Sequence, residues 1–251
     1  MSNSVKGKVA LVSGGGSGIG AATAVLLARR GASVVVSDIN EKAAQATVDK
    51  IISAGGNAAA FKANVAVAAD AEATVEFAKK TFGGLHLAFN NAGIVGPEKL
   101  IGELSPEGWK SVIDINLNGV FYGLRYEIPA ILESGGGAIV NTSSIAGLIG
   151  ISNIGAYVAS KHAVAGLTKS ASLDYATKGI RINSVHPGYI DTPLIAPWTD
   201  TDLKTTLIGL HPIGRLGKAE EVANVVAFLL SDEASFMNGA QIAVDGGYTT
   251  V

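Results

Sequence analysis

The chain has 251 residues, 48% of them hydrophobic and 16% charged, with a formal net charge of −2. It contains no cysteine, which excludes disulfides, thiolate catalysis and cysteine-ligated metals, and its four histidines lack the spacing of a metal site. No Lys/Arg run exceeds two residues, so we expect neither nucleic acid nor a membrane surface as a partner. The amino end lacks an apolar signal segment and no apolar run reaches about 18 residues, which predicts a cytoplasmic protein.

The first motif is a glycine-rich turn between a strand and a helix. An apolar run at residues 9–12 leads into SGGGSGIG, residues 13–20, and a helical pattern follows. Backbone N–H groups and the dipole at a helix N-terminus attract a phosphate. The glycines do not fit the strict G-x-G-x-x-G fingerprint, but they fit G-x-x-x-G-x-G at Gly14, Gly18 and Gly20. A glycine-rich turn alone is often a plain turn; in this position it predicts a dinucleotide site.

Asp38 ends the second predicted strand, residues 34–37. It follows Gly20 at close to the ~20 residues expected of the acid that binds an adenosine ribose. Its alternative role is to cap the helix that begins at Glu41. A carboxylate here would repel a 2′-phosphate, and neither residues 14–20 nor residues 39–41 offer an attracting Arg or Lys. Asp38 therefore predicts NAD rather than NADP.

The middle of the chain alternates helical and strand patterns. We expect helices at about 41–54 and 70–82, strands at 58–62 and 87–89, and helical patterns between 105 and 133. The NNAG of residues 90–93 follows a predicted strand, where a tight turn would explain it by itself. Asn116 lies inside a helical pattern. It is either a surface residue or the mark of a backbone break that holds a water molecule.

Residues 138–161 carry the strongest chemical signal. A short apolar strand, residues 138–140, is followed by the hydroxyls of Ser143 and Ser144, and the next helix carries Tyr157 and Lys161. Residues at i and i+4 share one helix face, about 5–6 Å apart at Cβ. We expect the ammonium to lower the pKa of the phenol from ~10, and an oxidised nicotinamide to lower it further. Without its neighbours, Tyr-x-x-x-Lys would more often be an exposed pair.

The last third of the chain contains a long irregular insert. A helix to about residue 176 and a strand at 180–185 precede the turn HPGYIDTP, residues 186–193, and residues 194–212 show weak periodicity. Long irregular inserts are more often functional, so we interpret residues 190–212 as a substrate lid. A helix at 219–230 and a strand at 241–244 follow. Apolar strands that alternate with helices predict an α/β fold, a parallel sheet covered on both faces, in a single domain over residues 1–251.

These motifs, in this order, resemble those of the short-chain dehydrogenase/reductases from Lys8 to Gly247. The resemblance is carried by SGGGSGIG, the acid after the second strand, NNAG, Asn116, NTSSIAG, YVASK, HPG with Thr192, and the terminal DGG. It implies a Rossmann-like, doubly wound sheet of seven parallel strands in the order 3-2-1-4-5-6-7, and a homotetramer. The departures are Ser13, where Thr is commoner, and Asn64, where Asp is more usual.

The resemblance also implies roles for individual residues. The catalytic set would be Ser144, Tyr157, Lys161 and Asn116: Tyr157 exchanges the proton, Ser144 holds the substrate oxygen, Lys161 holds the nicotinamide ribose, and Asn116 holds a water molecule. No metal is implied. The NAD contacts would be Gly14, Ser17, Gly18, Ile19, Gly20, Asp38, Ile39, Asn64, Val65, Asn91, Ala92, Gly93, Tyr157, Lys161, Pro187, Gly188, Ile190 and Thr192.

The substrate pocket is expected to be mostly apolar, which predicts a hydrophobic secondary alcohol or ketone, cyclic, aromatic or steroid-like. The same residues would also suit an ordinary core. The expected pocket residues are Ile94, Val95, Ile145, Ile154, Tyr189, Leu194, Trp198 and Leu207.

Other functions fit the sequence less well. A 3-oxoacyl-thioester reductase using NADPH is opposed by Asp38 and by the lack of a basic patch for an acyl carrier. A non-catalytic NAD-binding sensor is opposed by the complete set of Ser144, Tyr157 and Lys161. A nucleotide-sugar epimerase usually has a longer chain. A serine hydrolase would need G-x-S-x-G, but Ile19 stands where the second glycine should be.

Overall fold

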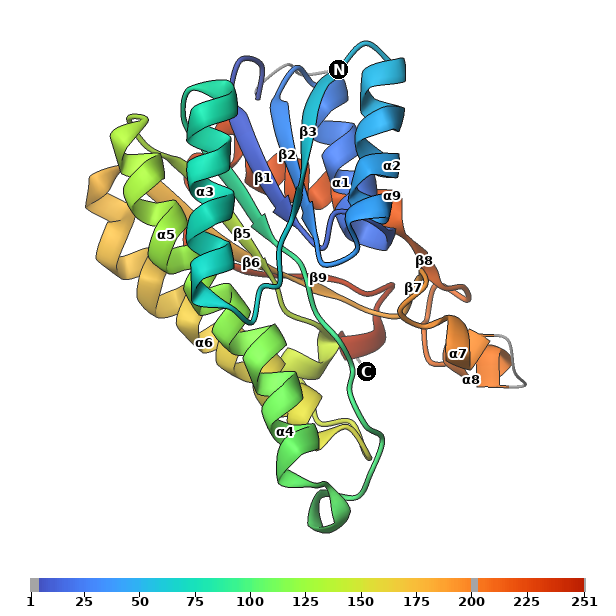
Figure 1. The fold of residues 1–251 in the computed structure, drawn as a ribbon. Coiled ribbons are helices and arrows are strands. Elements are labelled where there is room, and N and C mark those ends of the chain that lie inside the picture. The colour runs from blue at the N-terminus through green and yellow to red at the C-terminus, as the bar shows by residue number, and fades with distance from the viewer. Residues whose placement is uncertain (1–4, 200–202, 251) are drawn as a thin grey trace.

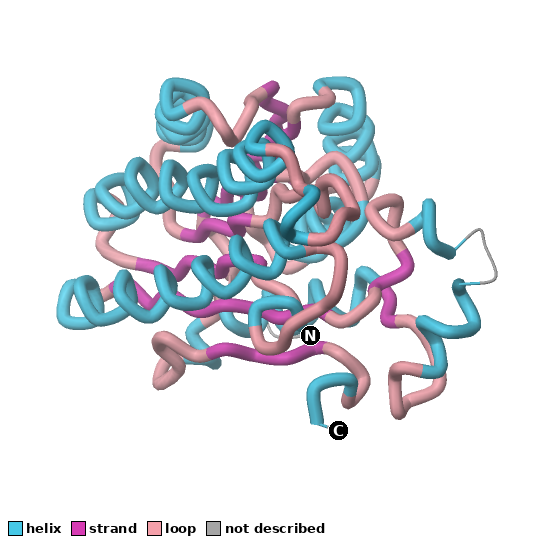
Figure 2. The backbone as a smooth tube through the Cα atoms, turned by 90° about the horizontal axis from the view of Figure 1, so that it is seen from below, coloured by secondary structure: helices cyan, strands magenta, loops and turns pink. Residues whose placement is uncertain are grey.

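The computed structural model describes residues 5–199 and 203–250 and shows an α/β architecture (Figure 1). Within these ranges, a seven-stranded parallel sheet has the order β3-β2-β1-β4-β5-β6-β9, as predicted. Figure 2 shows its strands as a layer between helices. The strands are β1 (Val9–Ser13), β2 (Ser33–Asp38), β3 (Asn57–Lys62), β4 (Leu87–Asn90), β5 (Gly137–Thr142), β6 (Ile180–Pro187) and β9 (Gln241–Val244).

Helices cover both faces of the sheet, as Figure 1 shows. Side chains alternate along each strand, so Ala10 and Val12 enter one core while Val9 and Leu11 enter the other. Burial on both faces explains why the strands are apolar throughout. One face carries α1 (Gly18–Arg29), α2 (Glu41–Ser53) and α9 (Ala219–Leu229); the other carries α3 (Ala68–Phe82), α5 (Gly119–Glu133) and α6 (Gly155–Tyr175), with α4 (Pro106–Ile113) preceding α5.

The insert after β6 forms a small subassembly at the lower right of Figure 1. Its short strands β7 (Ile190–Asp191) and β8 (Gly217–Lys218) pair in parallel, and between them lie the helices α7 (Ala196–Thr199) and α8 (Leu203–Gly209). We predicted weakly periodic chain here. The helices have four and seven residues, too few positions for a helical period to be read from the sequence.

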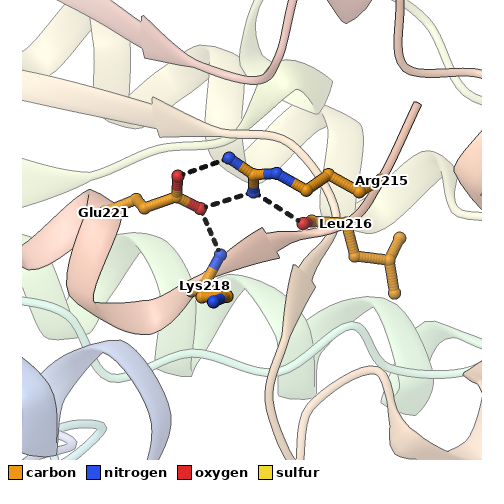
Figure 3. A network of polar contacts seen from close by, with 4 residues as sticks. All are labelled: Arg215, Leu216, Lys218 and Glu221. Atoms are coloured by element: carbon orange, nitrogen blue, oxygen red, sulfur yellow. Dashed lines mark hydrogen bonds and ion pairs between the residues drawn. The ribbon is translucent and has the colours of Figure 1, made fainter. Parts of the chain in front are cut away.

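An exposed ion pair holds the segment that leads from this insert into α9 (Figure 3). The Arg215 guanidinium donates to both carboxylate oxygens of Glu221, at 2.8 and 2.7 Å. One of these oxygens also accepts the backbone N–H of Lys218, at 2.8 Å. Arg215 lowers the pKa of Glu221 to about 2, so the pair persists across the working pH range. It joins β8 to the first turn of α9.

The carboxyl end of β6 differs from the prediction. β6 continues through Pro187, which pairs with Val244, although we predicted a turn from residue 186. A proline is tolerated at a strand end, where the ladder does not need its N–H. Within the described ranges, none of the helices is both long and apolar enough to cross a membrane.

Candidate active site

A cavity of about 560 Å³ opens at the carboxyl ends of the strands, where ligands bind in parallel α/β sheets. It brings together nearly all the predicted site residues. The predicted cofactor contacts that line it are Gly14, Ser17, Gly18, Ile19, Asp38, Ile39, Asn64, Val65, Asn91, Ala92, Gly93, Tyr157, Lys161, Pro187, Gly188, Ile190 and Thr192. The predicted substrate residues that line it are Ile94, Val95, Ile145, Ile154, Tyr189, Leu194 and Trp198, and Ser144 lies between the two groups.

Three predicted site residues do not line the cavity. Leu207 packs with Ile195 and Leu216 in a small core of the insert, so its predicted substrate contact is wrong. Gly20 lies beneath the glycine-rich turn, where a Cβ would meet the Gly14 carbonyl oxygen at 2.1 Å. Asn116 lies deeper still. The prediction missed several residues that line the cavity, most of them within one or two positions of a predicted site residue: Ala63, Ile115, Thr142, Ser143, Ile151, Pro193 and Ile195.

Asp38 binds the glycine-rich turn rather than capping a helix. Its Oδ2 accepts the Gly16 N–H at 2.9 Å and its Oδ1 accepts the Asn40 N–H at 2.9 Å. A Cβ on Gly16 would lie 2.8 Å from Oδ2, so the contact requires a glycine. Asn40 itself caps α2 by accepting the N–H of Ala43. The alternative prediction, a helix cap at Asp38, is therefore wrong.

The groups around the glycine-rich turn fit a dinucleotide. α1 begins inside the cavity, its N-cap Ser17 makes no side-chain cap, and its first turn has no acidic residue. The N–H groups of that turn thus have no competing side-chain anion. Gly18 has a φ of +51°, and a Cβ there would meet Thr192 at 3.2 Å. Backbone donors for a diphosphate therefore stand beside the Asp38 carboxylate, a suitable acceptor for ribose hydroxyls.

Ser144, Tyr157 and Lys161 line the same cavity and lie close to one another. A hydrogen bond joins Ser144 to the Tyr157 phenol, and the Lys161 Nζ lies 5.5 Å from the centre of the phenol ring. Nζ donates to the Thr142 carbonyl at 2.8 Å. Burial lowers the pKa of Lys161 to about 8, so the amine remains mainly protonated at neutral pH.

The pKa of Tyr157 moves in the direction opposite to our prediction. Burial raises it above its ordinary value, and the hydrogen bond from Ser144 only partly opposes this. Low-dielectric surroundings disfavour phenolate, and Lys161 alone does not reverse that effect. A second positive charge next to the ring is therefore needed before Tyr157 can serve as a base near neutrality.

Asn116 lies in a π-helical turn, Asp114–Asn118, between α4 and α5. It is fully buried, so the surface alternative is wrong, and the π-turn confirms the predicted backbone break; the water molecule there stays a prediction. Its amide donates to the Ile94 carbonyl at 2.8 Å and its Oδ1 accepts the Ile94 N–H at 2.9 Å. π-Turns of this kind often occur at functional sites. Here the turn aims Asn116 at the chain segment that forms one cavity wall.

His186 holds the backbone of Ser144 through a hydrogen bond, a role that the sequence analysis missed. It is fully buried, and its Nδ1 donates to the Ser144 carbonyl at 3.0 Å. The Gly147 N–H also donates to this carbonyl, at 2.8 Å. The Nε2 of His186 lies 2.9 Å from the Ser184 hydroxyl. The backbone of Ser144 is thus fixed on two sides.

Comparisons with known proteins agree with this geometry. A family model described as Enoyl-(Acyl carrier protein) reductase matches residues 14–249. A cyclohexanol dehydrogenase of Acinetobacter sp. is 65% identical over 250 residues, covering 100% of this chain and 98% of that protein. A 2,5-dichloro-2,5-cyclohexadiene-1,4-diol dehydrogenase of Sphingobium indicum is 44% identical over 250 residues, covering 98% of this chain and 99% of that protein. The crystal structure of a short-chain type dehydrogenase/reductase from Mycobacterium marinum matches with a TM-score of 0.95 and 33% identity, over 99% of this chain and 98% of that chain.

Proposed function

Because the chain belongs to the short-chain dehydrogenase/reductases, we propose that it is an NAD-dependent dehydrogenase of cyclic secondary alcohols. The observation that carries the proposal is the placement of Ser144, Tyr157 and Lys161 in one cavity. One half of this cavity is lined by residues suited to a dinucleotide, and the other half is apolar. The similar enzymes of Acinetobacter and Sphingobium are named for alcohols on six-membered carbon rings. An apolar wall suits such a ring.

Tyr157, Ser144 and Lys161 divide the proton chemistry between them. In oxidation, Tyr157 takes the proton of the substrate hydroxyl; in reduction, it returns that proton to the carbonyl oxygen. Ser144 donates a hydrogen bond to the same oxygen and stabilises the charge that develops on it. Lys161 supplies one of the positive charges that the buried phenol requires, and it would hold the nicotinamide ribose. When bound, NAD supplies the second positive charge and accepts the hydride from the carbinol carbon.

Asn116 would complete the set through its π-turn, where a water molecule on the opened backbone could connect Lys161 with solvent. Its side chain is already committed to Ile94 and to the Ser160 hydroxyl. The backbone around Asn116, rather than its amide, is thus the part we assign to that water. We further propose that residues 190–212 close over bound substrate, within a single domain that spans residues 1–251.

The assembly and location form a separate part of the proposal: a cytoplasmic homotetramer. Exposed apolar side chains on α5 and α6, Phe121 at 48% and Leu173 at 79% relative exposure, support helix-mediated association. Light scattering coupled to size-exclusion chromatography tests it, with four times the chain mass as the expected result.

The first test compares initial rates of cyclohexanol oxidation with NAD and with NADP. We expect kcat/KM to favour NAD by about 100-fold, because placing a phosphate against Asp38 costs a few kcal/mol. In Asp38→Asn, the carboxylate charge is lost while the shape is kept, so the preference should fall toward unity. A wild-type preference for NADP would overturn the role of Asp38.

The catalytic assignment has its own control. Tyr157→Phe should abolish turnover of cyclohexanol and leave binding of NADH, followed by its fluorescence, within a few-fold of wild type. Binding of NADH without turnover of any cyclic alcohol by the wild-type protein would contradict the proposed function and favour an NAD-binding sensor.

A further inference from the structure

The substrate half of the cavity has an almost wholly apolar wall. Beyond Ser144 and Tyr157, two polar side chains reach it from the insert, Tyr189 and Trp198. The Trp198 indole N–H is already used, since it donates to the Glu98 carboxylate at 2.6 Å. The remaining wall is Ile94, Val95, Ile145, Ile151, Ile154, Pro193, Leu194 and Ile195.

The Tyr189 hydroxyl has no hydrogen-bond partner in the described part of the chain, nor is it sealed away from the cavity. Phenylalanine would fill the same wall without a polar atom. The oxygen remains accessible, so water would satisfy it until a ligand arrives. The hydroxyl is therefore placed where a partner from outside the protein can satisfy it.

The neighbours of Tyr189 fix the direction of its ring. Its ring centre lies 6.4 Å from that of Trp198, 5.8 Å from that of His211 and 6.0 Å from that of Tyr248. The Tyr189 backbone N–H donates to the His211 Nε2 at 3.2 Å. Because both the ring and the backbone of Tyr189 are held, little further side-chain entropy is lost when a ligand binds the hydroxyl.

Tyr189 and Tyr157 line the same cavity, and their phenols interact electrostatically. Tyr189 also borders a second, smaller cavity, whose lining includes Arg215 and Asp245. The ionisable groups that act on the pKa of its phenol are nevertheless Tyr248, Tyr157 and Glu98. Burial, reinforced by these groups, raises the pKa of Tyr189 to about 12. The group is thus a neutral O–H donor throughout the working pH range.

We propose that the Tyr189 hydroxyl donates a hydrogen bond to a second oxygen of the substrate, carried by a ring carbon remote from the one oxidised at Tyr157. This rests on the proposed function and narrows it: the preferred substrates are cyclic alcohols with an additional hydroxyl, keto or ether oxygen. The first oxygen binds Ser144 and Tyr157, the ring contacts the isoleucine wall, and the second oxygen reaches Tyr189.

The test uses two ring alcohols of equal size, 4-methoxycyclohexanol and 4-ethylcyclohexanol. Each has one oxidisable hydroxyl, and they differ in whether the remote group can accept a hydrogen bond. The wild-type enzyme should favour the methoxy compound by about tenfold in kcat/KM, chiefly through KM, as one hydrogen bond in an apolar site predicts. In Tyr189→Phe this preference should disappear, because the variant loses more kcat/KM on the methoxy compound than on the ethyl compound.

Tyr248→Phe is the matched control, because it removes the same atom from the same aromatic cluster but does not line the main cavity. It should keep the methoxy preference. The proposal is overturned if wild type shows no such preference, if Tyr189→Phe retains it, or if Tyr189→Phe slows both substrates equally. If the wild-type enzyme oxidised neither ring alcohol, that result would instead contradict the proposed function itself.

Discussion

At the scale of single residues, His186 shows how the tautomer of a buried histidine positions Ser144, for which we propose a catalytic role. A carbonyl oxygen can only accept, so the proton lies on Nδ1, which donates to Ser144, and Nε2 accepts from the Ser184 hydroxyl. Burial lowers the pKa of His186 to about 4, so the ring is neutral at working pH. One defined tautomer thus holds the carbonyl of Ser144, and with it the direction of the Ser144 hydroxyl.

We predict that His186→Asn retains far more activity than His186→Gln. The Asn amide can donate from near the position of Nδ1, whereas the Gln amide reaches the position of Nε2 and leaves the Ser144 carbonyl without this donor. Both variants lose the ring, so their melting temperatures should fall similarly, by a few degrees. The kcat of the Gln variant should be about tenfold below that of the Asn variant, with KM for NAD unchanged. Equal kcat values in the two variants would leave His186 a purely structural residue.

At the scale of elements, a side-chain hydrogen bond joins the insert to the opposite rim of the cavity. Trp198 of α7 donates to Glu98, which follows β4. The neighbouring Lys99 N–H donates to the Asn153 carbonyl at 2.8 Å, so this rim is tied to the loop that precedes α6. The proposed closure of the insert would therefore bring it against a wall that is itself anchored.

We predict that Glu98→Ala raises KM for cyclohexanol three- to tenfold with little change in kcat, because the closed insert loses about 1 kcal/mol. Glu98→Gln keeps an acceptor for the indole N–H and should behave like wild type. Limited proteolysis at the insert, with and without NADH, reports closure directly. If Glu98→Ala is cleaved no faster than wild type and keeps its KM, the contact does not hold the insert.

The strands and the grouping of Ser144, Tyr157 and Lys161 could be predicted from sequence because their signals are local. Ser144, Tyr157 and Lys161 are placed by one strand end and one helix turn, and the cavity does bring them together. The insert could not be predicted in this way, because Leu207 turns inward only once Ile195 and Leu216 are packed against it.

The direction of the Tyr157 pKa also depends on the whole fold. Spacing on a helix reveals the ammonium four residues away, but not how much solvent the surrounding chain removes from the phenol. The π-turn at Asn116 is a similar case, since its buried amide needs Ile94 as a partner from a distant loop.

At the scale of the whole molecule, a chain of buried polar side chains joins β4 and β5 to the two helices, α5 and α6, that cover one face of the sheet. The Asn90 amide donates to Glu127 of α5 at 2.9 Å and to Asn141 at 3.1 Å, and Asn141 donates to Thr168 of α6 at 3.0 Å. Glu127 is 1% exposed and no ion pair reaches it in the described residues. Burial raises its pKa from 4.5 to about 7, so near neutrality the fold contains a carboxyl group that resists ionisation.

This carboxyl group makes stability fall as pH rises. Between pH 4.5 and about 7 the unfolded chain loses the Glu127 proton while the folded protein keeps it, so the folded state binds more protons and its stability decreases. At 1.36 kcal/mol per pH unit the loss of unfolding free energy amounts to about 3 kcal/mol, complete above pH 7 and absent below pH 4.5.

Glu127→Gln removes the titrating proton and keeps an oxygen that accepts from Asn90. Denaturant unfolding should find this variant about 3 kcal/mol more stable than wild type at pH 8 and equal to it at pH 4, while Glu133→Gln, at the exposed end of the same helix, should show no such trend. A constant difference between Glu127→Gln and wild type across that range would mean that packing, and not ionisation, sets the cost of this residue.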